Sequence, residues 1–82
     1  MCGITFLRKI IKKNAIYYFN KIQHRGPDNS GYIMYNDMFI GCHRLAITNL
    51  NKSGNQPFEL NDVILICNGQ IYNYLDIGKK YN

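Results

Sequence analysis

The sequence is poor in acidic residues: five Asp and Glu stand against ten Lys and Arg, a formal net charge of +5. An excess of positive charge suggests a polyanionic partner such as nucleic acid. Phosphate-binding surfaces, however, need clustered basic residues. Here the basic residues are scattered, apart from short pairs such as Lys12-Lys13 and Lys79-Lys80. We therefore expect no nucleic-acid partner.

The sequence also lacks paired cysteines and long apolar runs. Cys2, Cys42 and Cys67 are odd in number and include no C-x-x-C pair, so neither a disulfide framework nor a zinc site is indicated, and no other metal is expected. No apolar run approaches the roughly 20 residues of a membrane span, and no charged segment followed by an apolar region opens the chain. These absences favour a cytoplasmic protein with no membrane partner.

What is present fits one small domain or a part of one. The chain has 82 residues, of which 46% are hydrophobic, a fraction too high for a typical disordered segment. A chain of this length buries only a limited core. No repeat, linker or low-complexity tract divides residues 1–82.

Hydrophobic periodicity predicts a chain of mixed α and β structure. Residues 2–7 are apolar and partly β-branched, as in a buried strand, while apolar residues at three- and four-residue steps over 10–23 indicate an amphipathic helix. Gly and Pro predict a loop over 24–28. Further along we expect a hairpin of 31–35 and 38–42 joined by Asn36-Asp37, a short extended stretch over 44–50, a loop over 51–57, a buried central strand over 63–67 and a helix over 71–80.

Cys2 would carry two useful groups if Met1 were removed, which the small cysteine side chain favours. It would then hold a thiol and a free α-amine on the same residue. With a reference pKa of roughly 7.7 to 8.0, such an amine is partly neutral at physiological pH and can act as base for the thiol. The alternative is that Cys2 is an ordinary small residue.

Other residues offer further groups that amide chemistry needs. Asn68-Gly69 presents a side-chain amide beside an unobstructed backbone N–H, suited to a developing oxyanion, although Asn-Gly is also a common hairpin turn. Arg44 is either a bidentate clamp for a carboxylate or a solvated surface arginine. His24 and His43 are either acid–base groups or satisfied structural histidines.

Five blocks, taken together, make the sequence resemble a known family. Their order and spacing over almost the whole chain resemble the glutaminase domain of glutamine-hydrolysing asparagine synthetase, a class II glutamine amidotransferase. The blocks are Met1-Cys2-Gly3-Ile4, His24-Arg25-Gly26-Pro27-Asp28, Gly41-Cys42-His43-Arg44-Leu45-Ala46-Ile47, Gln56-Pro57 and Asn68-Gly69-Gln70-Ile71-Tyr72-Asn73.

The resemblance implies an α+β fold of the N-terminal-nucleophile hydrolase type, in which two stacked sheets lie between helical layers in a four-layer αββα sandwich. It implies hydrolysis of glutamine to glutamate and ammonia, with Cys2 as nucleophile and its α-amine as base. Asn68 and Gly69 would form the oxyanion hole, and Arg44 would hold the glutamine carboxylate. The loop over 24–28 would shape the site without taking part in a chemical step.

The resemblance also assigns the rest of the substrate site. Backbone groups near Leu45 and Ile47 would help to hold glutamine. The third residue of the last block is usually a glutamate that helps to hold the substrate's ammonium, and here that residue is Gln70. A second acidic residue of the family lies beyond Asn82. We therefore expect residues 1–82 to be the N-terminal part of the domain, with the second half of the fold missing and little or no turnover by this chain alone.

The partners follow from the same interpretation. Glutamine is the expected substrate, and a separate chain that completes the domain or a synthetase subunit is the expected protein partner. No cofactor is expected in residues 1–82, because ATP and Mg would belong to a synthetase domain that this chain does not include. The alternative is a non-catalytic, truncated remnant or interaction module. The acceptor of the ammonia stays open.

Overall fold

The computed structural model describes residues 2–47 and 50–81. In chain order, this part contains β1 (Gly3–Arg8), α1 (Lys12–Asn20), β2 (Asn29–Tyr35), β3 (Met38–Arg44), β4 (Phe58–Leu60), β5 (Val63–Leu65) and α2 (Tyr74–Tyr81), with 3₁₀ turns at Gln23–Arg25 and Lys52–Gly54. All the strand pairs are antiparallel. The chain is thus of mixed α and β structure, as the sequence predicts.

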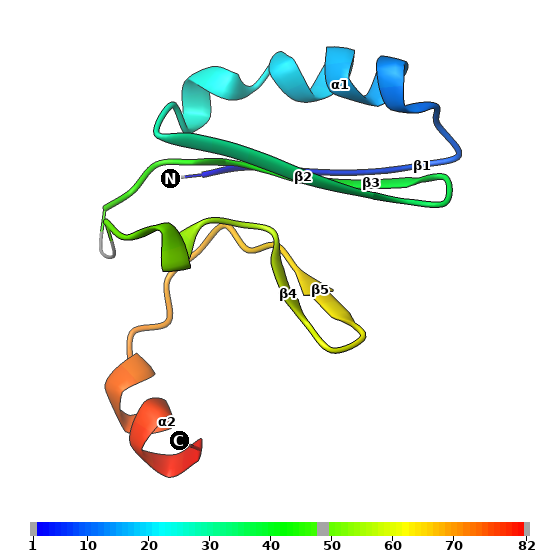
Figure 1. Cartoon of the computed structure of the whole chain (residues 1–82). Coiled ribbons are helices and arrows are strands. Elements are labelled where there is room, and N and C mark those ends of the chain that lie inside the picture. Colours follow the sequence, from blue (N-terminus) through cyan, green and yellow to red (C-terminus); the bar gives the residue numbers. More distant parts are fainter. Residues whose placement is uncertain (1, 48–49, 82) are drawn as a thin grey trace.

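A three-stranded sheet in the order β1-β3-β2 forms the centre of the molecule, and α1 lies across one of its faces (Figure 1). The predicted hairpin is confirmed, and its strands reach back to Asn29 and on to Arg44. Asn36-Asp37 joins them, with Asn36 at a φ of 54°. Asparagine tolerates this left-handed conformation better than most residues because its short side chain can hydrogen-bond locally.

The core lies between α1 and the sheet. Ala15 and Phe19 of α1 are buried against Phe39 of β3, and the rings of Phe19 and Phe39 meet edge to face at 5.2 Å between centroids. The helix has no side-chain N-cap and no acidic residue in its first turn. Because a helix this short is marginal alone, its stability comes from this packing. It is shorter than the predicted 10–23, since the N–H of Lys21 already bonds the carbonyl of Tyr18 in a 3₁₀ pattern.

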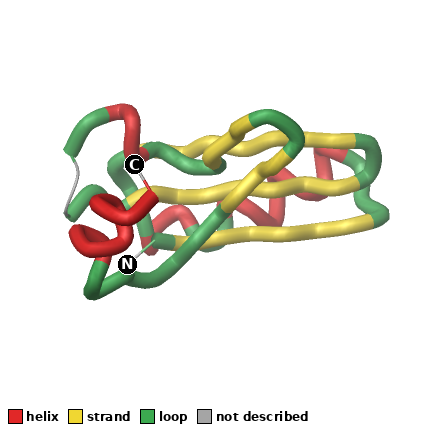
Figure 2. Tube along the Cα trace, turned by 90° about the horizontal axis from the view of Figure 1, so that it is seen from below, coloured by secondary structure: helices red, strands yellow, loops and turns green. Residues whose placement is uncertain are grey.

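The second sheet is the hairpin of β4 and β5, seen with the larger sheet in Figure 2. The prediction of a buried central strand over 63–67 is wrong. The strand is Val63–Leu65, it pairs with β4, and Val63 and Leu65 are 64% and 53% exposed. An apolar run predicts a strand but does not say what will cover it. Of the predicted extended stretch over 44–50, only Arg44 belongs to a strand, because it ends β3 and no strand follows over 45–47; residues 48–49 lie outside the described residues.

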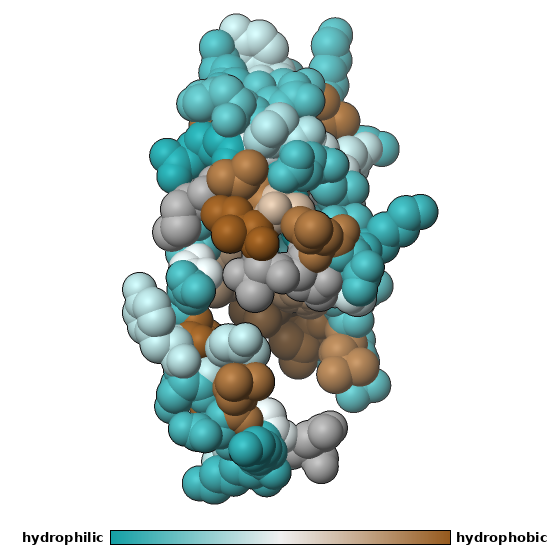
Figure 3. Space-filling model, turned by 90° about the vertical axis from the view of Figure 1, so that its left-hand side faces the viewer, coloured by the Kyte–Doolittle hydropathy of each residue, from teal (hydrophilic) through white to brown (hydrophobic). Residues whose placement is uncertain are grey.

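The face of the three-stranded sheet opposite α1 is only partly covered: Cys42 and Arg44 are buried at one end of it, while other side chains remain exposed. It carries Ile4 and Phe6, which are 42% and 55% exposed, and the molecule also shows apolar side chains at the end where the N-terminus lies (Figure 3). The accessible surface of 6497 Å² exceeds the roughly 5,100 Å² expected for a compact monomer of this mass. The radius of gyration, 13.7 Å, likewise exceeds the roughly 11.7 Å of a compact chain of this length. The molecule as a whole is therefore less compact than a typical monomer of its size.

The predicted final helix is confirmed as α2, which begins at Tyr74 and has no buried residue. It stands apart from the three-stranded sheet in Figure 1. Within residues 2–47 and 50–81, no helix is long and apolar enough to cross a bilayer.

Candidate active site

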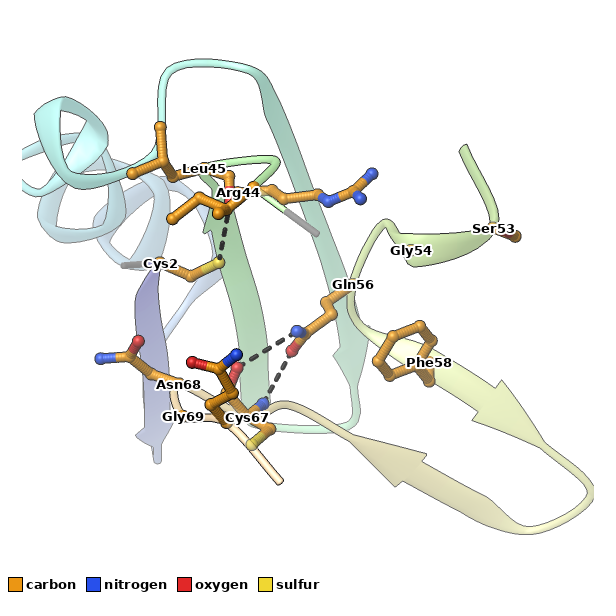
Figure 4. A pocket seen from close by; sticks show the side chains of 12 residues that line it. Cys2, Arg44, Leu45, Ser53, Gly54, Gln56, Phe58, Cys67, Asn68 and Gly69 are labelled. Carbon is orange, nitrogen blue, oxygen red and sulfur yellow. Dashed lines mark hydrogen bonds between the residues drawn. The ribbon is translucent and has the colours of Figure 1, made fainter. Parts of the chain in front are cut away.

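A pocket of about 350 Å³ lies where the end of β3, the loop before β4 and the segment after β5 meet (Figure 4). Its volume lies within the usual range for small-molecule sites. The structure places all seven residues of the sequence-predicted site in its lining, together with five others that the sequence analysis did not assign. The seven are Cys2, Arg44, Leu45, Ile47, Asn68, Gly69 and Gln70, and the five are Ser53, Gly54, Gln56, Phe58 and Cys67.

Cys2 directly precedes β1 and is half-buried. Because Ile4 pairs with Cys42 in the β1–β3 ladder, Cys2 lies on the face of the sheet opposite α1, beside the end of β3. Its thiol points toward the carbonyl of Leu45, with 4.0 Å between Sγ and the oxygen. The bounds of the predicted first strand are therefore correct to within one residue, but the prediction that it is buried is wrong, because Ile4 and Phe6 are exposed. Met1, whose removal would free the α-amine, lies outside the described residues.

Cys42 pairs with Ile4 in the β1–β3 ladder, on the face where Cys2 lies, and is fully buried. Burial raises the pKa of the Cys42 thiol to about 12; the charge of nearby Cys2 and a hydrogen bond with it add to the rise, and Arg44 opposes it. At neutral pH Cys42 is therefore a protonated thiol. It does not compete with Cys2 as a nucleophile, because the thiolate is the reactive form.

Arg44 is the last residue of β3 and is only 7% exposed. Its Nη1 donates hydrogen bonds to the carbonyl of Asn51 at 2.7 Å and to Oδ1 of Asn55 at 2.8 Å. The guanidinium extends toward Gly54 (Figure 4), where a Cβ would overlap Nη2 and lie 2.8 Å from Cζ. The loop thus holds the guanidinium in the pocket wall, and the absence of a side chain at position 54 makes room for it.

The segment over 24–28 braces the end of β3. Gly26 lies so close to the strand that a Cβ would overlap the carbonyl group of His43. Asp28 then pairs with the backbone on both sides of Leu45: its N–H donates to the carbonyl of Arg44 at 2.9 Å, and its Oδ2 accepts from the N–H of Ala46 at 2.7 Å. These contacts hold the backbone at Arg44 and Leu45, the two residues of this segment that line the pocket. They are the means by which the loop over 24–28 would shape the site.

Asn68-Gly69 follows β5 and faces Cys2 across the pocket. It is not the turn of a hairpin: in the described structure, the turn that joins β4 to β5 is Asn61-Asp62. The residue before it, Cys67, is held by Gln56. The side-chain Nε2 of Gln56 donates to the carbonyl of Cys67 at 3.1 Å, and the N–H of Cys67 donates to Oε1 of Gln56 at 2.7 Å. The sequence predicts no role for Gln56, although Gln56-Pro57 is one of the five blocks.

Neither histidine lines this pocket. His43 is 1% exposed, its ring stacks on Phe19 at 3.8 Å between centroids, and its Nε2 lies 2.8 Å from the carbonyl oxygen of Phe19. A carbonyl only accepts, so Nε2 carries the proton, and in the neutral ring Nδ1 accepts from the hydroxyl of Ser30 at 2.6 Å. His43 is therefore a satisfied structural histidine. Among the described residues, no three His, Cys, Asp or Glu side chains gather as a metal site.

Comparison with known proteins identifies the family to which the chain is similar over its whole length. The model of the glutamine amidotransferase domain family matches residues 1–82. The chain is 35% identical over 106 residues to a Methanocaldococcus jannaschii protein that bears the name asparagine synthetase [glutamine-hydrolyzing] 2, an alignment covering 100% of this chain and 21% of that protein. It is 37% identical over 87 residues to asparagine synthetase [glutamine-hydrolyzing] 1 of Saccharomyces cerevisiae, covering 98% of this chain and 15% of that protein.

A third relative, the root asparagine synthetase [glutamine-hydrolyzing] of Pisum sativum, is 40% identical over 88 residues, which cover 98% of this chain and 15% of that protein. The chain thus spans about a fifth or less of the length of these curated relatives. No solved structure matches it.

Proposed function

Because the chain belongs to the glutamine amidotransferase domain family, we propose that its pocket binds glutamine and hydrolyses the side-chain amide with Cys2 as the nucleophile. The observation that carries the proposal is the pocket itself. It is lined by Cys2, by Asn68-Gly69 and by Arg44, which come from three separate parts of the chain. Nucleophile, oxyanion donors and carboxylate clamp are the groups that hydrolysis of a small amino-acid amide requires.

The chemistry runs in two stages. Once Met1 is removed, the α-amine of Cys2 takes the thiol proton, and Sγ attacks the carbonyl carbon of the glutamine amide. The side-chain N–H of Asn68 and the backbone N–H of Gly69 stabilise the oxyanion, and ammonia leaves with the proton from the amine. Water then hydrolyses the thioester to glutamate. Loss of one oxyanion donor typically lowers kcat by roughly 10²- to 10³-fold.

Substrate binding rests on one strong contact. Arg44 is held in place to receive the α-carboxylate, and the backbone near Leu45 and Ile47 lies beside it. The described lining contains no carboxylate, and Gln70 is neutral. The substrate's ammonium therefore has no anionic partner among the described residues. This predicts a high KM for glutamine and slow turnover at millimolar concentrations.

We also propose that the fold is part of a four-layer αββα sandwich of the N-terminal-nucleophile hydrolase type. Two observations support this. Helix α1 covers one face of the three-stranded sheet, and apolar side chains such as Ile4 and Phe6 remain exposed on the other. A second sheet on that face, contributed by further chain or by a partner, would bury them. An experimental structure of the folded domain with this face bare would contradict the proposal.

The enzymatic proposal is tested by glutamate release from glutamine, with mass spectrometry confirming the processed N-terminus. Cys2→Ala should abolish the release. Cys67→Ser is the matched control, because Cys67 is an exposed cysteine of the same pocket, and it should keep most of the activity. An N-terminal extension that blocks the α-amine should also abolish release.

Equal release by the wild type and Cys2→Ala would contradict the proposal and favour a non-catalytic remnant. Loss of activity in Cys67→Ser but not in Cys2→Ala would move the nucleophile to Cys67.

A further inference from the structure

We propose that Gln56 is a positioning residue that fixes the oxyanion donors Asn68-Gly69 at their distance from Cys2. The inference rests on the proposed glutaminase function. In it, Gln56 makes no bond to the reacting amide and acts through the backbone of Cys67.

The side chain of Gln56 pairs completely with the backbone of Cys67. Its Oε1 accepts the N–H at 2.7 Å, and its Nε2 donates to the carbonyl at 3.1 Å (Figure 4). The Gln56 side chain thus offers Cys67 the same donor and acceptor that the backbone of a neighbouring strand offers to a residue within a sheet. Strand β5, however, has already ended at Leu65. Gln56 therefore continues the hydrogen bonding of this segment up to the residue that precedes Asn68.

The backbone of Gln56 packs on the three-stranded sheet, beside which Cys2 lies. A Cβ at Gly31 of β2 would lie 2.7 Å from the backbone carbonyl oxygen of Gln56, so the Gln56 backbone lies directly on the strand. Gly31 pairs with Cys42, which places it on the face from which Cys2 enters the pocket. In addition, the neighbouring Asn55 accepts a hydrogen bond from Arg44. One residue thus connects the wall that holds Cys2 and Arg44 to the wall that holds the oxyanion donors.

The oxyanion donors need such a connection because little else holds their segment. Strands β4 and β5 make few contacts with the three-stranded sheet, and every described residue from Cys67 to Tyr81 is exposed. Oxyanion stabilisation depends strongly on geometry, and a misplacement of about 1 Å can lower a rate by roughly 10²-fold. A pair of hydrogen bonds to the residue before Asn68 is therefore placed where it sets the geometry of the donors.

The matched pair of variants is Gln56→Met and Gln23→Met. Methionine keeps the length of glutamine without its hydrogen bonds, and Gln23 is an exposed glutamine of the 3₁₀ turn that does not line the pocket. We expect the Cys67 amide of Gln56→Met to exchange with solvent at least 10-fold faster by NMR, while the amides of β3 keep their wild-type rates. Gln23→Met should change neither. An unchanged Cys67 exchange rate in Gln56→Met would overturn the inference.

Kinetics separate positioning from substrate contact. Gln56→Met should lower kcat for glutamine by roughly 10- to 100-fold with a change in KM below about 3-fold. The rate of Cys2 alkylation by iodoacetamide should stay at the wild-type value, because that reaction needs no oxyanion donors. A raised KM with unchanged kcat would make Gln56 a substrate contact and overturn the inference. Absence of Cys2-dependent hydrolysis in the wild type would refute the proposed function instead, and amide exchange would still decide whether Gln56 anchors the segment.

Discussion

The substitution Gly26→Ala tests how the loop over 24–28 braces the end of β3. Gly26 has φ −155°, an extended value open to any residue, so the cost comes from contact alone. The new methyl group would overlap the carbonyl of His43 and lie 2.6 Å from the carbonyl carbon of Arg44. Both obstacles are backbone atoms of a strand bonded on both sides, and they cannot rotate away as a side chain would.

The magnitude follows from these contacts. Overpacking usually costs about 1 to 3 kcal/mol, and a clash with backbone belongs at the upper end of that range. If the loop moves part of the way to relieve the clash, the hydrogen bond from the Asp28 N–H to Arg44 is weakened or lost, which costs about 1 kcal/mol in place of part of the steric cost. We expect the free energy of unfolding to fall by roughly 3 kcal/mol. In a domain of this size, this corresponds to a melting temperature lower by roughly 12 to 24 °C.

The assay is a thermal melt followed by far-UV circular dichroism at two protein concentrations. Gly78→Ala is the control, since Gly78 lies within α2 and a Cβ there meets nothing within 4 Å. Alanine should slightly favour that helix, so this variant should not lose stability. A melting temperature for Gly26→Ala within about 2 °C of the wild type would refute the bracing of β3, because a shift that small corresponds to less than about 0.5 kcal/mol in a domain of this size.

Three further predictions follow from the pocket. Gly54→Ala should crowd the Arg44 guanidinium and raise the KM for glutamine about 10-fold, and an unchanged KM would argue against Arg44 as the clamp. Gln70→Glu should lower that KM roughly 2- to 5-fold by giving the ammonium an anionic partner at an exposed position; a higher KM would contradict this. Burial raises the pKa of the Cys42 thiol from 9.0 to about 12, so between these values the unfolded chain binds fewer protons and stability falls as pH rises. The urea concentration at the unfolding midpoint should fall less between pH 9 and 12 in Cys42→Ala than in the wild type. Midpoints that fall equally with pH in both proteins would contradict the effect of burying the thiol.

Local sequence signals predicted the sheet and its helix well, because short-range geometry decides those elements. Asn36-Asp37 between two apolar runs predicts the β2–β3 hairpin, and the structure uses the same dipeptide, Asn61-Asp62, between β4 and β5. The same signal is present at the second hairpin, but the apolar run after it predicts a buried central strand. Hydrophobicity alone does not distinguish a buried strand from an exposed edge.

The order of the blocks predicts seven site residues, and one pocket brings these seven together. The supporting residues could not be predicted in the same way. Gly54 makes room for Arg44, and Gln56 pairs with Cys67, only because segments distant in sequence meet in the fold. His43 looked like a candidate acid–base group, yet its place under Phe19 makes it part of the core. Residue type suggests chemistry, and burial and partners decide whether that chemistry is accessible.

The most direct test of the account is to trap the covalent intermediate. The chain with its processed N-terminus is mixed with glutamine, quenched rapidly in acid and digested, and the cysteine peptides are examined by mass spectrometry. We expect a γ-glutamyl thioester on the peptide that begins with Cys2, absent in Cys2→Ala and retained in Cys67→Ser. Glutamate formation without that adduct, or an adduct on Cys67 in its place, would contradict Cys2 as the nucleophile.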